Sequence, residues 1–133
     1  MNIVLDACAL IAFLRDEPGA EVVESLFSET NNSCMAHAIN LCEVYYDFLR
    51  AKDEKTALEA LADLESVGLV TREEMNSSFW QEAGKYKVKL KVSLADCFAI
   101  ALARLENALI VTSDHNHFEP VAHTGICGVK FIR

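Results

Sequence analysis

The sequence predicts an α/β fold built on a parallel sheet. Two short runs, residues 3–5 and 108–111, are continuously apolar rather than alternating, which is typical of strands covered on both faces. Each run ends in polar residues, at Asp6 and at Thr112. Between the two runs, apolar residues recur mostly at helical spacing, so we expect helices to cover the sheet.

The first strand is expected to lead directly into a helix. Residues 7–14 contain no Gly or Pro and follow Asp6 without any turn signal. In an open parallel sheet, ligands bind beyond the carboxyl ends of the strands, where Asp6 would lie. Asp6 is therefore either the N-cap of this helix or part of a functional site. The choice depends on whether other acids reach the same edge of the sheet.

Composition and charge narrow the class of protein. The 133 residues are enough for a single domain, residues 1–133, and too few for two. No window approaches the roughly 18 apolar residues of a membrane span. The five cysteines form no C-x-x-C pair and are typical of small buried side chains in a reducing cytoplasm. The formal charge of −8 argues against simple electrostatic attraction to nucleic acid, but not against a site whose bound cations set the local field.

The next segment is predicted to hold two helices and a short strand. We expect helices at residues 20–28 and 38–49, with a strand at residues 34–36 between them. The second helix is predicted from a set of apolar residues that recur at helical spacing. Its members are Ala38, Leu41, Cys42, Tyr45, Phe48 and Leu49.

Glu43 lies on this second helix and has two interpretations. It belongs to a polar stripe that fits a solvated helix face. The stripe consists of Asn40, Glu43, Asp47 and Arg50. However, Ile39 and Tyr46 lie one turn to either side of Glu43, which makes it a boundary position that can face a cleft.

The middle of the chain is predicted to add a helix at 54–66 capped by Asp53, an edge strand at 69–71, and a helix from 77 toward 87. Residues 85–92 alternate between lysine and other residues and imitate a strand, but we interpret them as a frayed helix end followed by a linker. The lysines have two possible roles. They can stabilise the helix C-terminus, or Lys89 and Lys91 can contact phosphates.

Asp96 is the most conspicuous acid in the sequence. It lies in a segment, residues 93–103, whose other residues are almost all apolar, which predicts a central, buried helix. Burying an isolated carboxylate costs several kcal/mol, so Asp96 must be hydrogen-bonded, paired or bound to a metal. Ser93 and Asp96 also fit a capping box. The two interpretations are compatible.

The strand at 108–111 repeats the pattern of the first. It runs into Thr112, Ser113 and Asp114, which places a second carboxylate after a buried strand and adds two hydroxyls that can orient ligands or water.

The C-terminal segment is predicted to be a polar loop followed by a strand. We expect His115 and His117 to be solvated there, with a zinc site as the minor alternative, and we expect Pro120 to end regular structure. A last strand is predicted at 128–132.

Three of these acids are expected to meet at one edge of the sheet. Asp6 and Asp114 follow buried strands, Asp96 begins a buried helix, and Glu43 is a possible fourth member. Such a cluster repels itself and needs protons or cations, and oxygen ligands favour Mg²⁺ or Mn²⁺. With cations bound, it could hold a phosphodiester and activate a water for in-line attack.

At this point the sequence resembles the PIN-domain ribonucleases, and within them the VapC-like toxins of toxin-antitoxin pairs. The matching segments occur in the expected order along nearly the whole chain. They are V-L-D-A-C-A-L followed by E-P-G-A-E, I-N-L-C-E-V-Y-Y, S-L-A-D-C-F-A-I-A-L-A, V-T-S-D-H-N-H-F-E-P and V-K-F-I-R.

The resemblance implies a three-layer α/β/α sandwich with a central parallel sheet and metal-dependent endonucleolytic cleavage of RNA. It also implies a homodimer and a small antitoxin that blocks the acidic cleft. By motif, Asp6, Glu43, Asp96 and Asp114 take the acidic positions, with Asp6, Asp96 and Asp114 as metal ligands. Thr112 or Ser113 takes a supporting role.

The sequence departs from the family pattern at two positions. Cys8 stands where such proteins commonly have Ser or Thr, and Asn116 stands where some relatives have another acid. These departures keep a non-catalytic interaction module as one alternative. A phosphate-accepting receiver or phosphohydrolase is another, although it would need a lysine near the acids.

Overall fold

The computed structural model describes residues 1–133 and shows a five-stranded, all-parallel sheet of order β3-β2-β1-β4-β5. The strands are β1 (Asn2–Leu5), β2 (Ser33–His37), β3 (Val70–Arg72), β4 (Leu109–Thr112) and β5 (Val129–Phe131). The helices are α1 (Ala7–Leu14), α2 (Ala20–Ser28), α3 (Ala38–Ala51), α4 (Glu54–Ser66), α5 (Ser77–Lys89), α6 (Leu94–Glu106) and α7 (His115–Thr124).

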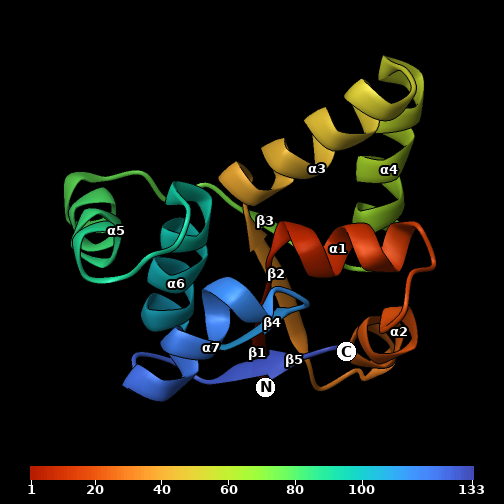
Figure 1. Cartoon of the computed structure of the whole chain (residues 1–133). Coiled ribbons are helices and arrows are strands. Elements are labelled where there is room, and N and C mark those ends of the chain that lie inside the picture. Colours follow the sequence, from red (N-terminus) through yellow and green to blue (C-terminus); the bar gives the residue numbers. More distant parts are fainter.

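The helices form layers on both faces of the sheet, as Figure 1 shows, so the predicted three-layer α/β/α architecture is confirmed. Val4 of β1 packs into the core shared with α5, α6 and α7, whereas Ile3 and Leu5 pack into the core shared with α1 to α4. All three side chains are fully buried. A continuous apolar run was the correct signal for a strand covered on both sides.

The order of the strands places a topological switch point between β1 and β4. From β1 the chain passes through α1 and α2 to β2 on one side, whereas β4 is reached through α5 and α6 and pairs with β1 on the other. Leu5 is in register with Val111, and the backbone N–H of Asp6 donates to the carbonyl of Val111 over 3.2 Å. Asp6 and Thr112 therefore emerge side by side, where open α/β sheets bind ligands.

Most predicted elements are present with nearly the predicted bounds. Helices α1, α2 and α4 match the predicted ranges, β3 is an edge strand, and residues 85–89 finish α5 rather than forming a strand. None of the helices is both long and apolar enough to cross a membrane.

The prediction of a polar loop at 115–117 was wrong. Residues 115–124 form α7, and Pro120 lies inside it. The helix persists because Asp114 caps it through the backbone N–H of His117, and because Phe118 and Val121 are fully buried on its inner face. Pro120 is exposed and removes only one backbone donor.

The helix predicted at 38–49 is present as α3, but its apolar stripe is not its most buried face. Its fully buried residues are Asn40 and Val44, whereas Cys42 and Leu49 are exposed. Near its start, α3 packs against α6. The buried surface of α3 therefore does not coincide with its apolar stripe. The side-chain amide of Asn40 donates to the carbonyl of Ala95 over 3.3 Å, whereas its buried Oδ1 has no hydrogen-bond partner.

The cysteines also differ from the prediction of buried side chains. Cys34 and Cys97 are buried, but Cys8 and Cys42 are exposed and Cys127 is intermediate. All five are free thiols.

Candidate functional site

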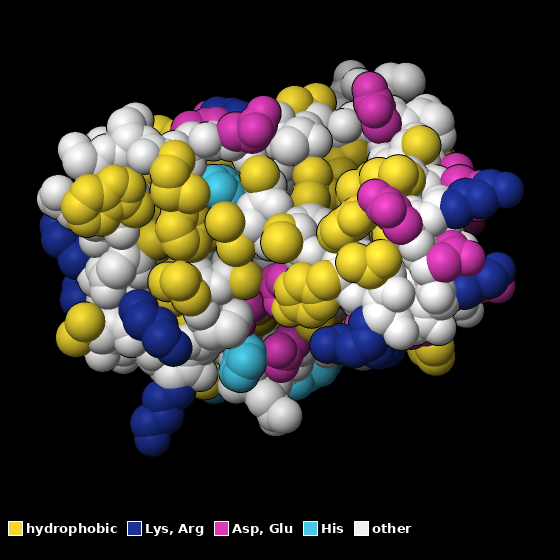
Figure 2. Space-filling view, turned by 90° about the horizontal axis from the view of Figure 1, so that it is seen from above, with side chains coloured by type: hydrophobic (Ala, Val, Ile, Leu, Met, Phe, Trp, Pro, Cys, Tyr) yellow, Lys and Arg dark blue, Asp and Glu magenta, His cyan; other side chains and the backbone are white.

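A small hollow of about 140 Å³ lies at the carboxyl edge of the sheet, beyond the ends of β1 and β4. Its lining includes all four acids singled out in the sequence, brought together from four separate segments. The lining residues are Asp6, Ala7, Cys8, Glu43, Ser93, Asp96, Asp114 and His117. Seen from above, acidic side chains gather in the middle of this face, beside histidine and bordered by hydrophobic side chains (Figure 2).

Asp6 is the most deeply buried of these acids, with 2% of its surface exposed. Its Oδ1 accepts a hydrogen bond from the N–H of Ala9 over 2.9 Å, which caps α1. Its Oδ2 accepts one from Thr112 Oγ1 over 2.5 Å. Burial, with smaller contributions from the charges of Asp96 and Asp114, raises the pKa of Asp6 to about 7, despite these hydrogen bonds. Asp6 thus serves as an N-cap and also lines the hollow.

Thr112 connects the two strand-end acids. Its hydroxyl donates to Asp6 and accepts from the backbone N–H of Asp114 over 2.9 Å. Thr112 is fully buried, so these two hydrogen bonds satisfy its polar group and fix the distance between the two acids. Ser113, the other predicted supporting residue, does not line the hollow.

Asp96 forms the predicted capping box of α6. Its Oδ2 accepts from the backbone N–H of Ser93 over 3.0 Å, while Ser93 Oγ accepts from the backbone N–H of Asp96 over 3.1 Å. The positive end of the helix dipole favours a carboxylate in this first turn. The capping box leaves the Asp96 carboxylate facing the hollow, so the two interpretations of this residue hold together.

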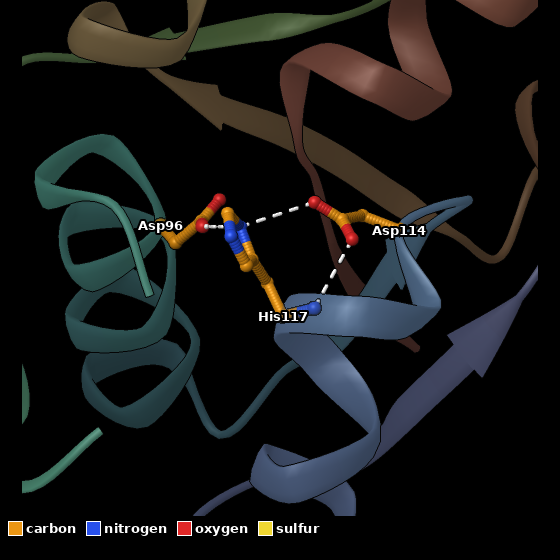
Figure 3. A group of neighbouring side chains, drawn as sticks. All are labelled: Asp96, Asp114 and His117. Carbon is orange, nitrogen blue, oxygen red and sulfur yellow. Dashed lines mark hydrogen bonds and ion pairs between the residues drawn. The ribbon is translucent and has the colours of Figure 1, made fainter. Parts of the chain in front are cut away.

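The sequence predicted that His117 is solvated, but the structure places it at the site. Its Nδ1 lies 2.8 Å from Asp96 Oδ2 and 3.1 Å from Asp114 Oδ2, between the two carboxylates (Figure 3). The spacing Asp114 to His117 was the available signal, because an N-cap and the third residue of the helix lie on one side of its first turn. The prediction of a polar loop at residues 115–117 gave this spacing no role.

Glu43 enters the hollow from α3, so the boundary interpretation describes its position better than the solvated one. Partial burial, followed by repulsion from Asp96, raises its pKa. Asn40, one turn earlier, joins α3 to the residue before Asp96 through its hydrogen bond with Ala95. This contact sets where Glu43 stands relative to Asp96.

The hollow has no cationic partner of its own, because neither lysine nor arginine lines it. Asp96, Asp114 and His117 have ligand atoms that all lie within 4.8 Å of one another. Two carboxylates and one imidazole at this spacing, beside the carboxylates of Asp6 and Glu43, form a donor set that fits a divalent cation.

Other predicted or unusual residues stand outside this group. Lys89 and Lys91 are exposed and do not line the hollow, and neither does Asn116. Cys8 lies at the rim. Desolvation by the surrounding protein, followed by repulsion from Asp6, raises the pKa of its thiol to about 12, so the thiol stays protonated near neutral pH.

The fold and the site together define a class: three-layer α/β/α proteins with an acidic site at the switch point of a parallel sheet. The PIN domain family model matches residues 3–123. The chain belongs to the PIN domain family.

Solved structures similar to this chain include several toxin-antitoxin proteins. A chain of VapBC2 from Rickettsia felis, bound to a DNA fragment from its promoter, aligns with TM-score 0.78 at 18% identity, covering 98% of each chain. One from DNA-bound VapBC of Salmonella typhimurium gives 0.74 at 14% identity, covering 100% of this chain and 99% of that one.

A third similar structure is VapC20 from Mycobacterium tuberculosis, described as a Sarcin-Ricin loop cleaving toxin. It aligns with TM-score 0.71 at 15% identity, covering 89% of this chain and 94% of its own. At these identities the likeness establishes the fold. None of the curated proteins matches the sequence significantly.

Proposed function

We propose that this protein is an endoribonuclease that depends on Mg²⁺ or Mn²⁺ and hydrolyses phosphodiester bonds in RNA. The observation that carries the proposal is the hollow itself. Four carboxylates from distant segments meet there with no lysine or arginine to neutralise them. Maintaining such repulsion has a cost that a structural role does not explain, whereas a cation-dependent site requires it.

In this proposal, Asp6, Asp96 and Asp114 hold the cation, and Thr112 orients the carboxylate of Asp6. A bound divalent cation supplies Lewis-acid stabilisation of the charge on the phosphate. Glu43 accepts a proton from the attacking water, for which a carboxylate with a raised pKa is suited. The new bond joins the water oxygen to phosphorus, and the bond from phosphorus to the leaving nucleotide oxygen breaks.

The direct test is cleavage of RNA by the purified protein with Mg²⁺ or Mn²⁺ and with EDTA. Asp96→Asn is expected to abolish cleavage, since Asn can still accept the hydrogen bond of the capping box but carries no charge. Asp53→Asn is the matched control, because Asp53 caps α4 outside the hollow. If Asp96→Asn cuts as fast as the parent protein, the assignment of the site is wrong.

We propose that phosphates of the RNA contact Lys89 and Lys91, which are exposed on the segment leading to Ser93. Each lysine that contacts a phosphate contributes to the salt dependence of binding. In the non-cleaving Asp96→Asn background, adding Lys89→Ala and Lys91→Ala should weaken RNA binding and flatten its dependence on KCl. Lys55→Ala, an exposed lysine on α4, is the matched control, and equal slopes for all three proteins would remove this part of the proposal.

We propose further that the protein is the toxin of a toxin-antitoxin pair, acts as a homodimer, and is inhibited by a small antitoxin that covers the acidic hollow. The support is the fold shared with VapBC proteins from Rickettsia felis and Salmonella typhimurium. Expression of this chain alone should arrest growth, and co-expression of a short neighbouring reading frame should restore it. Light scattering measures the mass of the purified protein, which is expected to be that of a homodimer.

The two alternative functions remain distinguishable. A phosphate-accepting receiver would need a lysine beside the acids, but no lysine lines the hollow and Lys130 is exposed on β5. Labelling of Asp6 by acetyl phosphate would favour that alternative. A non-catalytic PIN module, which Cys8 keeps open, would bind Mn²⁺ weakly in calorimetry and would not cut RNA with either metal.

A further inference from the structure

We infer that His117 supplies a nitrogen ligand to the cation of this site, so that the site binds Mn²⁺ in preference to Mg²⁺. The inference rests on the proposed function, because it concerns the cation that the acidic hollow holds. It adds the imidazole of His117 to the carboxylates proposed above, of which those of Asp96 and Asp114 lie within 3.1 Å of its Nδ1. The oxygen-only set expected from the sequence does not include this nitrogen.

The geometry places one nitrogen atom between two carboxylates that could share a cation with it. His117 Nδ1 lies 2.8 Å from Asp96 Oδ2 and 3.1 Å from Asp114 Oδ2, and the three ligand atoms lie within 4.8 Å of one another (Figure 3). Without a cation, a proton on Nδ1 can satisfy both oxygens. A divalent cation can replace that proton with small rearrangement, since it would then face two oxygens and one nitrogen.

The backbone that carries the imidazole is fixed on both sides of His117. The backbone N–H of His117 donates to Asp114 Oδ1 over 3.1 Å, and the next residue, Phe118, is fully buried. The Nε2 atom has no hydrogen-bond partner within the protein, and the side chain is 40% exposed. The tautomer with the proton on Nε2, facing solvent, therefore leaves the Nδ1 lone pair free for a cation.

The neighbouring histidine does not join the site. The ring of His115 stacks on Phe131 with centroids 4.0 Å apart, and its Nε2 lies 2.7 Å from the carbonyl oxygen of Arg133. The H-x-H spacing therefore does not form a two-histidine zinc pair here. Only one of the two imidazoles reaches the carboxylates.

One nitrogen ligand changes the preference among cations. Mg²⁺ is a hard ion that favours oxygen ligands, whereas imidazole suits first-row transition ions. Mn²⁺ is suited to the carboxylate oxygens of the remaining acids and, as a first-row transition ion, accepts an imidazole nitrogen more readily than Mg²⁺ does. Replacing the imidazole by a carboxylate would return the site to oxygen ligands and so remove the preference for Mn²⁺ over Mg²⁺ that the nitrogen supplies.

The decisive experiment detects the nitrogen directly. Protein labelled with ¹⁵N-histidine is titrated with Mn²⁺, and pulsed electron paramagnetic resonance reads the coupling between Mn²⁺ and ¹⁵N. The coupling is expected in the parent protein and in His123→Asn, an exposed histidine on the same helix, and is expected to vanish in His117→Asn. Persistence of the coupling in His117→Asn, or its absence in a parent protein that binds Mn²⁺, would overturn the inference.

Calorimetry supplies the second measurement. The ratio of Mn²⁺ to Mg²⁺ affinity is expected to fall in His117→Asp relative to the parent. An unchanged ratio counts against the inference. Circular dichroism and thermal melts verify folding, which is expected because His117 is part-exposed and Asp114 still caps α7.

The two proposals fail in different ways. If Asp96→Asn and Asp114→Asn lose metal binding and RNA cleavage while His117→Asp keeps the parental ratio, only the role of His117 is wrong. If no variant alters metal binding and the parent does not cut RNA, the proposed nuclease function is wrong as well.

Discussion

Asp6 and Asp53 perform the same local task in different surroundings. Each is the N-cap of a helix and accepts a hydrogen bond from the backbone N–H three residues later, over 2.9 Å from Ala9 and 2.8 Å from Thr56. Yet burial raises the pKa of Asp6 to about 7, whereas the hydrogen bonds from Thr56 lower the pKa of exposed Asp53. Capping stabilises a carboxylate, and burial beside other acids outweighs it.

This difference shows how the site is made. Asp6 and Asp114 are N-caps, and Asp96 is the third residue of the capping box on α6. The sheet topology directs all three carboxylates into one hollow, whereas Asp53 caps α4 elsewhere. The caps position the carboxylates, since each is fixed to the first turn of a helix. Convergence then raises the energy of their charges, which a cation can lower. The following substitutions use Asp53 as the reference for an ordinary cap.

The largest expected effect is on cleavage. Asp6→Asn should slow RNA cleavage on the order of 10²–10³-fold, because it removes a charge facing the cation while keeping an acceptor for Ala9. Asp53→Asn should cut at the parental rate. Single-turnover cleavage of a labelled RNA measures both. Equal loss in the two variants would mean that the charge of Asp6 in the hollow has no special role in cleavage.

A divalent cation should stabilise the folded protein only through the carboxylates that converge in the hollow, and not through Asp53. At about 100 times its Kd, Mn²⁺ is expected to stabilise the native state by about 2.7 kcal/mol. Thermal melts with Mn²⁺ and with EDTA should therefore differ by several degrees for the parent and for Asp53→Asn. The melts should coincide for the double variant Asp96→Asn/Asp114→Asn. A full metal-induced shift in that double variant would place the cation somewhere other than the hollow.

The two caps should also respond to pH with opposite sign. The pKa of Asp6 rises from 3.8 to about 7 on folding, so the folded state holds a proton that the unfolded chain has lost between these values. Its contribution to stability is present at acidic pH and is lost as the pH rises through about 7. Asp53, whose pKa is lowered, contributes above its ordinary pKa and loses this contribution as the pH falls.

Urea unfolding in EDTA across pH 4 to 8 tests this sign difference. Asp6→Asn should flatten the decline in the free energy of unfolding between about pH 4 and 7, because Asn does not titrate. Asp53→Asn should leave that decline in place. A parent protein whose stability is flat over this range would contradict the raised pKa of Asp6.

The smallest expected effects come from weakening a cap without altering a charge at the site. Ser93→Ala removes one half of the capping box on α6 and should cost about 1 kcal/mol of stability. Cleavage should fall by less than tenfold, because the backbone N–H of Ser93 still donates to Asp96. Asp53→Ala should lower the melting temperature slightly with no change in cleavage. A larger loss of cleavage in Asp53→Ala than in Ser93→Ala would refute the separation of the two roles.

The sequence predicted much of the fold because its signals are local. The apolar run of Ile3 to Leu5 and the capping pattern of Ser93 and Asp96 both depend on neighbouring residues. Helix α7 was missed for a non-local reason, because it depends on the burial of Phe118 and Val121 against the rest of the core. Pro120 and the polar residues around it outweighed that burial in the sequence pattern.

The sequence by itself determined which acids follow strands or begin helices, because hydrophobic runs and caps are properties of short segments. Only the tertiary structure decided that Asp96 and Asp114 lie on either side of His117, and that Glu43 faces them rather than solvent. Those relations depend on the pairing of β1 with β4 and on the packing of α3 against α6 and of α7 against the core. Both arise from packing between segments far apart in the chain.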